Sequence, residues 1–371
     1  MTDLEVQARQ AIDSWALEAA EALRKSEGGI LAAQQPVRYL GNASANSYRG
    51  PSPVIWAGSQ PGGSPSPNSW IEDILVDPAV GMHFYDDFLV IGSGPAAATA
   101  LTGSIGQWAL YQSSAGGNIQ DGGIIGGGIL FNPGSIAVSS GTSTPTTALS
   151  ALAGSFQITS TSTGTAGLQG KLAFECRVAL TSITSGQRDA FIGLADQNSP
   201  QSNNPFTVVS GGSSQMLTTT RNLIGFYNAD SGRGQDWAFV FQLASTAPVF
   251  PTSLNSLVST VLGSAIVAGT YYKLGFIYDP NAQTETIGTA STGQTAGTTA
   301  KAMIKVYVNG VQAAAFLTQA ANILTASFPT GIMGPNMAFA NVSNSGTSNS
   351  GTAIAGQMIV DFIRVAQVAL T

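Results

Sequence analysis

The sequence predicts an all-β protein in which a sandwich of about a dozen antiparallel strands follows an N-terminal helix and an extended arm. Apolar residues alternate with polar or small ones in residues 171–181 (KLAFECRVALT), and residues 236–243 and 271–279 repeat that alternation. A period of two places one face of each strand against a core. Segments rich in Gly, Ser and Thr separate the strand candidates without an intervening helical pattern, which favours a β-sandwich.

Residues 1–35 are expected to contain one amphipathic helix, over residues 2–27. Thr2 and Glu5 fit a capping box at its start, and two glycines follow its end. Apolar side chains recur at spacings of three and four, on one face of the helix: Leu4, Ala8, Ile12, Trp15, Ala19 and Leu23. Because an isolated helix of this length is marginal in water, we expect this stripe to pack on a partner.

Residues 36–80 are expected to form an extended arm, because seven of the 17 prolines fall within them. Proline fixes φ and removes a hydrogen-bond donor, so the segment suits neither a helix nor a sheet. The arm also carries four large aromatic side chains, which indicates that it lies on a surface. Helix and arm together predict one set of partner-binding residues: Leu4, Ile12, Trp15, Leu23, Tyr39, Tyr48, Trp56 and Trp70.

Residues 81–371 contain the strands of the predicted sandwich. Residues 303–316 predict a hairpin whose turn is Asn309-Gly310, a pair that suits the twist of two neighbouring strands. The remaining strand candidates are 83–91, 107–112, 127–131, 155–159, 189–195, 222–228, 336–342 and 357–368.

Charge is scarce: Lys and Arg number 14 and Asp and Glu 20 in 371 residues, for a net charge of -6. The sequence has no basic cluster, so we expect neither a nucleic acid nor an anionic membrane as partner. It also has no apolar run of membrane-spanning length and no secretory signal peptide pattern at its start. The single cysteine, Cys176, excludes an internal disulfide.

Four segments carry a family resemblance: FYDDFL, KLAFECRVAL with DAFIGLAD, the hairpin KVYVNGVQ, and the closing strand MIVDFIRVAQ. Together they resemble the concanavalin A-like lectin/glucanase jelly roll, over roughly residues 82–371. The resemblance implies a fold that hosts glycan binders, glycosidases and structural modules alike. A helix and an aromatic-bearing arm ahead of such a jelly roll are also similar to virion proteins of tailed bacteriophages, especially capsid decoration or cement proteins.

Jelly-roll glucanases place a catalytic pair of acids on one strand face. Their Glu-x-Asp-x-x-Glu cluster is absent. Glu175 stands alone on its strand beside Arg177, which favours a cross-strand ion pair, and His83, the only histidine, is interpreted as a structural residue. We therefore expect no catalytic residues and no enzymatic activity.

The sequence contains candidate ligands for a metal ion and one candidate phosphate-binding loop. Asp196, Asp230 and Asp236 lie near strand ends and offer oxygen ligands, but calcium requires six to eight of them, so turn chemistry is the default interpretation. The glycine-rich residues 122–128 lack the Lys-Ser/Thr end of a phosphate-binding loop. No metal and no cofactor are expected.

The leading functional hypothesis is a structural virion protein, a capsid decoration or cement protein on the outer surface of a bacteriophage head, made in the host cytoplasm. Its helix and arm would bind the major capsid protein and neighbouring copies of the chain, as a dimer or trimer. The alternative is a glycan-binding, lectin-like module of a phage fibre or surface adhesin, with a host-surface glycan as ligand.

Overall fold

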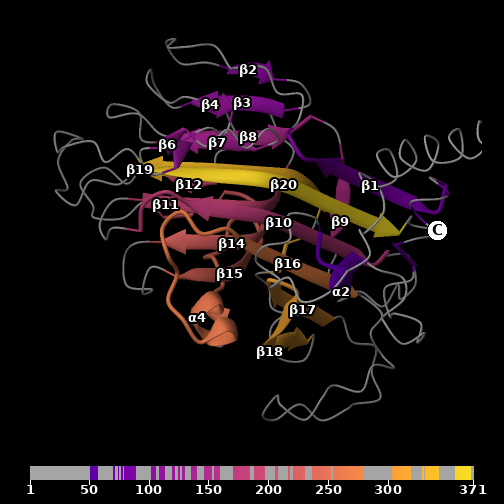
Figure 1. Ribbon diagram of the computed structural model, residues 1–371. Coiled ribbons are helices and arrows are strands. Elements are labelled where there is room, and N and C mark those ends of the chain that lie inside the picture. The colour runs from indigo at the N-terminus through magenta and orange to yellow at the C-terminus, as the bar shows by residue number, and fades with distance from the viewer. Residues whose placement is uncertain are drawn as a thin grey trace, which may run out of the picture. The chain divides into compact units, whose positions relative to one another are not determined.

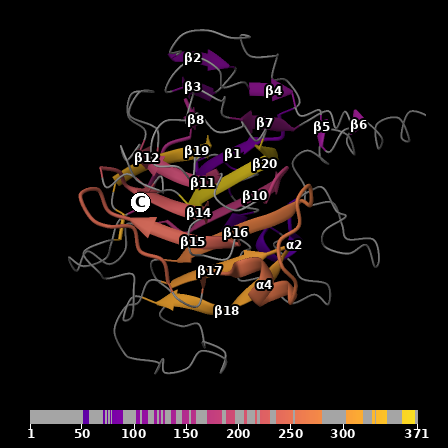
Figure 2. The same ribbon diagram turned by 90° about the vertical axis from the view of Figure 1, so that its left-hand side faces the viewer.

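Two large antiparallel β-sheets lie face to face in the computed structural model of the chain, as Figure 1 shows from one side and Figure 2 after a quarter turn. The topology confirms the predicted all-β, jelly-roll type of sandwich. The structure describes the following residues: 51–56, 70–71, 74, 77, 79–88, 102–105, 108–112, 119–121, 124–125, 128–129, 135–139, 146–152, 154–158, 170–183, 188–196, 205–207, 216–217, 220–229, 236–251, 254–279, 303–318, 328–329, 331–341 and 356–368. The predicted helix over residues 2–27 lies outside them.

The first sheet, sheet I, has eight strands, and the last strand of the chain lies in its interior. Seven strands follow one another in the order β18 (Val311–Thr318), β17 (Met303–Val308), β16 (Tyr272–Asp279), β10 (Leu172–Leu180), β20 (Gln357–Val368), β7 (Ile136–Ser139) and β4 (Ile119–Asp121). The eighth, β1 (Gly81–Asp86), pairs with the second half of β20, so the opening and closing strands of the sandwich are neighbours.

The second sheet, sheet II, also has eight strands. Their order is β15 (Trp237–Gln242), β14 (Leu223–Ala229), β11 (Arg188–Asp196), β19 (Gly331–Asn341), β8 (Thr146–Ala151), β3 (Trp108–Gln112) and β2 (Thr102–Ile105), with β9 (Phe156–Ile158) paired to β19. Two small ribbons are separate from both sheets: β12 (Phe206–Thr207) with β13 (Met216–Leu217), and β5 (Ile124–Ile125) with β6 (Gly128–Ile129).

Strands outnumber the dozen expected, because short strands form in Gly- and Thr-rich segments whose alternation is too brief to detect from the sequence. The predicted hairpin is confirmed as β17 and β18, and its turn residues Asn309 and Gly310 have φ of 52° and 77°. Helices are short in the described part of the chain: α2 (Pro53–Trp56) and α4 (Leu257–Leu262). No helix among the described residues is long and apolar enough to cross a membrane.

The core between the sheets is rich in aromatic rings. Phe174 and Phe276 of sheet I stack at 5.3 Å between centroids, and Phe239 of sheet II meets Phe276 edge-on at 5.5 Å. Offset and edge-to-face contacts of this kind add to the free energy gained by burying the rings. These inward positions are those that the alternation pattern assigned to the core.

The expectation that each sheet has only one buried face is wrong. Every residue of β15 and β16 is buried, so the outward faces of these strands are covered as well. On sheet II the cover includes Phe206 and Leu217 of the β12–β13 ribbon, which join the apolar side chains of Phe191 and Tyr227. The outward face of sheet I differs in that its cover includes buried charged side chains, among them Glu175, Lys273 and Arg364.

Candidate functional site

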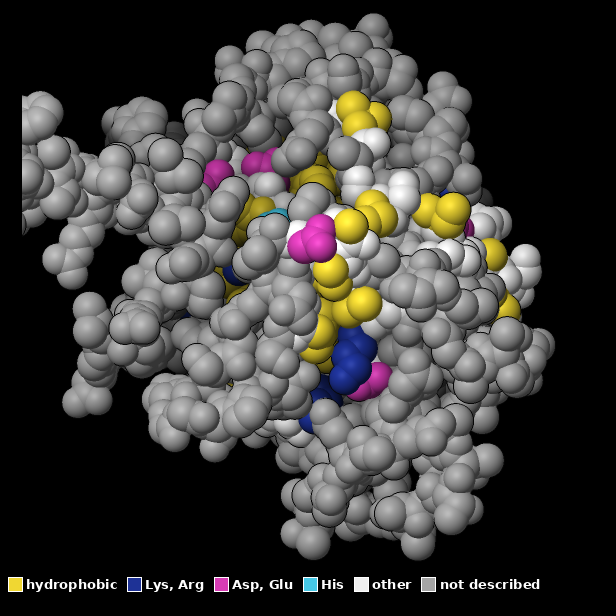
Figure 3. Space-filling view, turned by 90° about the vertical axis from the view of Figure 1, so that its right-hand side faces the viewer, with side chains coloured by type: hydrophobic (Ala, Val, Ile, Leu, Met, Phe, Trp, Pro, Cys, Tyr) yellow, Lys and Arg dark blue, Asp and Glu magenta, His cyan; other side chains and the backbone are white. Residues whose placement is uncertain are grey.

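A short segment of the predicted arm lies on the outward face of sheet I. We call residues 51–56 the arm anchor. Its side chains Ile55 and Trp56 are fully buried, in an apolar cluster with Ala173, Ile277 and Ala366 of sheet I. Figure 3 shows the side of the molecule on which β1 and α2 lie, where apolar side chains sit directly beside basic and acidic ones. The anchor thus ties the arm to the sandwich across more than a hundred residues of sequence.

The sequence of the anchor explains its helical turn. Pro53 occupies the first position of α2, where its missing N–H and fixed φ are tolerated. The Ser52 carbonyl accepts hydrogen bonds from the backbone N–H groups of Ile55 (3.0 Å) and Trp56 (3.1 Å). This turn leaves the Ser52 N–H and the Trp56 indole N–H free to bind the sheet.

Both donors bind one carboxylate oxygen. Oε2 of Glu175, on β10, accepts from the Ser52 backbone N–H at 2.8 Å and from Trp56 Nε1 at 2.7 Å. Glu175 is 0% exposed, and its Oε1 has no hydrogen-bond partner among the described residues. Both of these hydrogen bonds of the anchor end on the same carboxyl group, so Glu175 is the central polar contact of the anchor.

Arg364, on β20, is the cross-strand register partner of Glu175. Its guanidinium carbon lies 4.3 Å from the centroid of a Trp56 ring, a cation–π distance, and its Nε donates to His83 Nε2 at 3.0 Å. Burial lowers the pKa of Arg364 to about 10, while the Glu175 charge opposes that shift. We call Glu175, Arg364 and Gly275 the anchor site, because the arm anchor contacts all three.

Burial dominates the titration of the two other charges near the anchor. It raises the pKa of Glu175, against hydrogen bonds from Ser52 and Trp56 and the nearby charge of Lys273. It lowers the pKa of Lys273 to about 8, against the attraction of Glu175. Each shift is limited by the opposite charge, so the two groups stabilise each other's ionised form in a buried place.

Lys273 gives a testable pH dependence. Its pKa falls from 10.5 in the unfolded chain to about 8 in the folded chain, so between these values the unfolded chain holds a proton that the folded chain has released. Stability contributed by Lys273 therefore rises with pH, by about 1 kcal/mol between about pH 8 and pH 9.5. Urea unfolding of the wild type and Lys273→Met across this range should show the rise in the wild type only.

Other groups do not obscure this comparison. Burial raises the pKa of the Cys176 thiol, so Cys176 contributes an opposite slope in the same pH range, but it does so in both chains. The difference between the wild type and Lys273→Met isolates the lysine. Equal slopes in the two chains would contradict the prediction.

Gly275 on β16 is where the anchor comes closest to the sheet. A Cβ placed on Gly275 would lie 2.6 Å from Ile55 Cδ1 and 3.0 Å from the Phe174 carbonyl oxygen. We expect Gly275→Ala to destabilise the chain by about 1–3 kcal/mol, as overpacking does. Ile55→Val, which removes Cδ1 alone, should recover part of that loss in the Gly275→Ala background. Thermal unfolding of the four chains tests this, and an additive double variant would contradict it.

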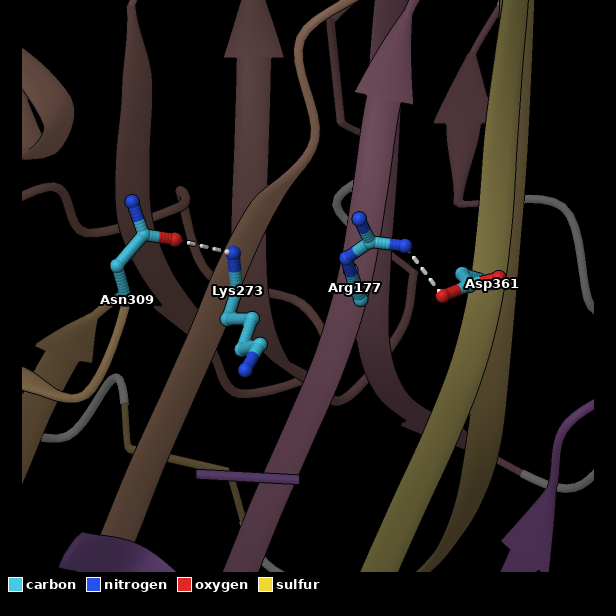
Figure 4. Close-up of polar contacts among 4 residues, drawn as sticks. All are labelled: Arg177, Lys273, Asn309 and Asp361. Atoms are coloured by element: carbon cyan, nitrogen blue, oxygen red, sulfur yellow. Dashed lines mark hydrogen bonds and ion pairs between the residues drawn. The ribbon is translucent and has the colours of Figure 1, made fainter. Parts of the chain in front are cut away.

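A second polar row crosses sheet I next to the anchor site. Figure 4 shows Asn309, Lys273, Arg177 and Asp361 side by side, from the β17–β18 turn to β20. Arg177 forms an ion pair with Asp361, and its guanidinium lies 4.1 Å from the ring centroid of Tyr271. The expected cross-strand ion pair on this strand therefore belongs to Arg177, whereas the carboxylate of Glu175 binds the arm anchor.

The carboxylates weighed as calcium ligands form local hydrogen bonds. Asp236 accepts from the backbone N–H groups of Val258 (3.1 Å) and Ser259 (2.8 Å) at the start of α4. Asp196 accepts from the backbone and side-chain amides of Asn222. Among the described residues no group of three His, Cys, Asp or Glu side chains is placed to hold a metal ion. Asp230 lies outside the described residues.

The structure places two of the eight predicted partner-binding residues. Trp56 is buried against its own sheet. Trp70 packs partly buried on the same cluster, and its indole nitrogen has no hydrogen-bond partner among the described residues. The other six lie outside the described residues: Leu4, Ile12, Trp15, Leu23, Tyr39 and Tyr48.

Sequence reasoning missed the pairing of Glu175 with the arm. Two signals were present: a carboxylate in the middle of an otherwise apolar strand of a charge-poor domain, and a Ser-Pro pair that starts a helical turn before a tryptophan. Neither signal identifies its partner, because Ser52 and Glu175 are 123 positions apart.

Comparison with known proteins gives structural likenesses only. No protein-family model and no curated protein sequence matches the chain. Among solved structures, the chain is similar to a beta-1,3-glucanase from Mycobacterium marinum (11% identity, TM-score 0.39, 76% of this chain and 97% of that one). It is also similar to a glycosyl hydrolase family 16 protein from Mycobacterium smegmatis (12% identity, TM-score 0.39, 76% of this chain and 98% of that one). A third similar structure is a pseudo beta-1,3-glucanase of Mycobacterium tuberculosis (10% identity, TM-score 0.39, 76% of this chain and 97% of that one).

The names of these proteins correct one expectation. No enzymatic activity is expected from the sequence, whereas the matched structures are named as glucanases or glycosyl hydrolases, one of them a pseudo-glucanase.

Proposed function

We propose that the chain is a structural protein of an assembled particle, of the capsid-decoration type, in which the sandwich is displayed and the preceding segment binds the coat. The observation that carries this proposal is the arm anchor. Ser52 and Trp56 are hydrogen-bonded to a buried carboxylate, so the anchor that follows the first 50 residues of the sequence has a fixed place on sheet I. A fixed attachment point is what a tethered coat-binding segment requires.

Composition supports the same proposal. A surface with few charges has few ions to desolvate when it packs against another protein, and desolvating an unpaired ion is expensive. In this proposal the major capsid protein and neighbouring copies of the chain are the partners, and the outer capsid surface is the location.

Deletion of residues 1–35 tests the proposal. The truncated chain is expected to keep the far-UV spectrum and cooperative unfolding of the sandwich and to lose copurification with icosahedral particles. Trp56→Ala in the full-length chain is the companion variant, since it keeps residues 1–35 and breaks the anchor. Normal decoration of particles by the truncated chain would contradict the proposal.

Glycan binding is the second candidate, favoured by the row beside the anchor site. The half-buried ring of Tyr271, with Arg177 over it and Asp361 holding Arg177, combines an aromatic face with charged hydrogen-bonding groups. Reproducible submillimolar binding on a glycan array, with or without calcium, and its loss in Tyr271→Ala would support this candidate. The same preparation should be assayed for β-glucan hydrolysis.

A further inference from the structure

We propose that the anchor site is a peptide-binding site, and that its ligand, the arm anchor, can be supplied by a second copy of this chain. This goes beyond the proposed function, because it concerns self-association of the chain without any particle. The ligand is a short segment with a Ser-Pro turn and a tryptophan four positions after the serine.

The contacts are those of a ligand in a site rather than of a strand in a sheet. The anchor belongs to neither sheet, and two of its hydrogen bonds, from Ser52 N–H and Trp56 Nε1–H, end on one Glu175 oxygen. Arg364 covers the indole from one side, and Ile55 packs over Gly275, where a side chain would not fit. Each of these contacts can be made equally well by a segment from another molecule.

The site also keeps polar atoms without partners while the anchor is bound. Within the described part of the chain, Glu175 Oε1, Arg364 Nη2 and Trp70 Nε1 are buried and have no hydrogen-bond partner. Buried polar atoms without partners oppose binding, since they give up water and gain nothing in return. The docked state is therefore weaker than its apolar contacts alone would make it, which lowers the cost of releasing the anchor from its own sheet.

The chain between the anchor and the sandwich is long enough for exchange. Thirteen residues separate Trp56 from Trp70, and they are rich in Gly, Ser and Pro. Fully extended, such a stretch spans up to about 45 Å, enough to reach a neighbouring sandwich. Exchange of an identical element between copies through such a connection is a low-cost route to dimers.

Complementary variants of the full-length chain test the proposal. Trp56→Ala leaves the site intact but removes its ligand, and Glu175→Ala keeps the ligand but removes its acceptor. Each variant alone is expected to be monomeric by size-exclusion chromatography with light scattering. Their mixture is expected to form a one-to-one complex, and the double variant Trp56→Ala/Glu175→Ala should form none with either chain.

A labelled peptide of residues 49–58 gives a second measurement by fluorescence anisotropy. It should bind Trp56→Ala at least tenfold more tightly than it binds the wild type, whose site is occupied, or than its own tryptophan-to-alanine version binds the same chain. If Trp56→Ala does not fold, Trp56→Phe, which keeps a ring but lacks the indole donor, takes its place. Absence of peptide binding would overturn the site, and peptide binding with a monomeric mixture would overturn the second copy as ligand.

Discussion

Trp56→Ala is expected to lower the free energy of unfolding by about 3–5 kcal/mol, the usual cost of truncating a buried tryptophan. Trp56 is 0% exposed, it donates its indole N–H to Glu175, and it lies under the guanidinium of Arg364. The substitution removes all three contributions and leaves Arg364 buried without the nearer of its two aromatic neighbours, since the centroid of the Tyr85 ring lies 5.9 Å away. Urea unfolding followed by near-UV circular dichroism measures the loss.

The matched control is Val54→Ala in the same helical turn. The side chain of Val54 is 45% exposed, so its truncation should change stability by less than about 0.5 kcal/mol. If both substitutions have the same small effect, the anchor contributes little to the stability of the sandwich, and the structural role given to Trp56 is wrong.

Glu175→Ala is expected to cost about 3–5 kcal/mol, because removing one partner of a buried charge network leaves the others uncompensated. The Ser52 N–H and the Trp56 indole N–H lose their acceptor, and Arg364 and Lys273 lose the nearby negative charge. Glu175→Gln keeps an oxygen that accepts both hydrogen bonds, so its cost should be clearly smaller. Equal losses in the two variants would show that acceptance of these hydrogen bonds is unimportant.

The wild type and Glu175→Gln are also expected to differ in the pH dependence of their stability. Burial raises the pKa of Glu175 above 4.5, so in the range between 4.5 and the folded pKa the folded chain binds the proton more tightly than the unfolded chain. The wild type must therefore gain stability relative to Glu175→Gln as pH falls through this range. A difference between the two chains that does not change with pH would contradict burial of the carboxyl group.

Trp56→Ala and Glu175→Ala should also be strongly non-additive. Both break the same hydrogen bond and both weaken the contact of the arm with Arg364, so the double variant should lose less than the two single losses combined. Additive losses would indicate that the two residues act independently.

Much of the fold follows from local patterns. The alternation in residues 171–181 identifies β10 and the side chains that enter the core, and Asn309-Gly310 identifies the hairpin turn. These patterns can be recognised in the sequence because side chains of a strand with one buried face alternate between apolar and polar every two residues, and because a two-residue turn needs residues that accept positive φ. Burial of the outward faces cannot be predicted from the local sequence, since it depends on segments from elsewhere in the chain.

The candidate site was predictable only in its parts. Trp56 was identified as an aromatic anchor, and Glu175 was noticed as a lone carboxylate on its strand. From the sequence, Trp56 is predicted to bind a partner and Glu175 to form an ion pair. Nothing in the local sequence links these two residues, because they are 119 positions apart. Arg364, which covers the indole, had no signal of its own within the closing strand.

The sequence by itself determined the long strands, the hairpin, the all-β class and the scarcity of charge, because each of these depends on residue type and short-range spacing. Only the tertiary structure decided that the arm binds its own sandwich and that one buried carboxylate receives it. The physical reason is that β10, β16 and β20 bring Glu175, Gly275 and Arg364 together from three distant parts of the chain. Their joint surface, and so the place for the tryptophan, exists only after the sheet has formed.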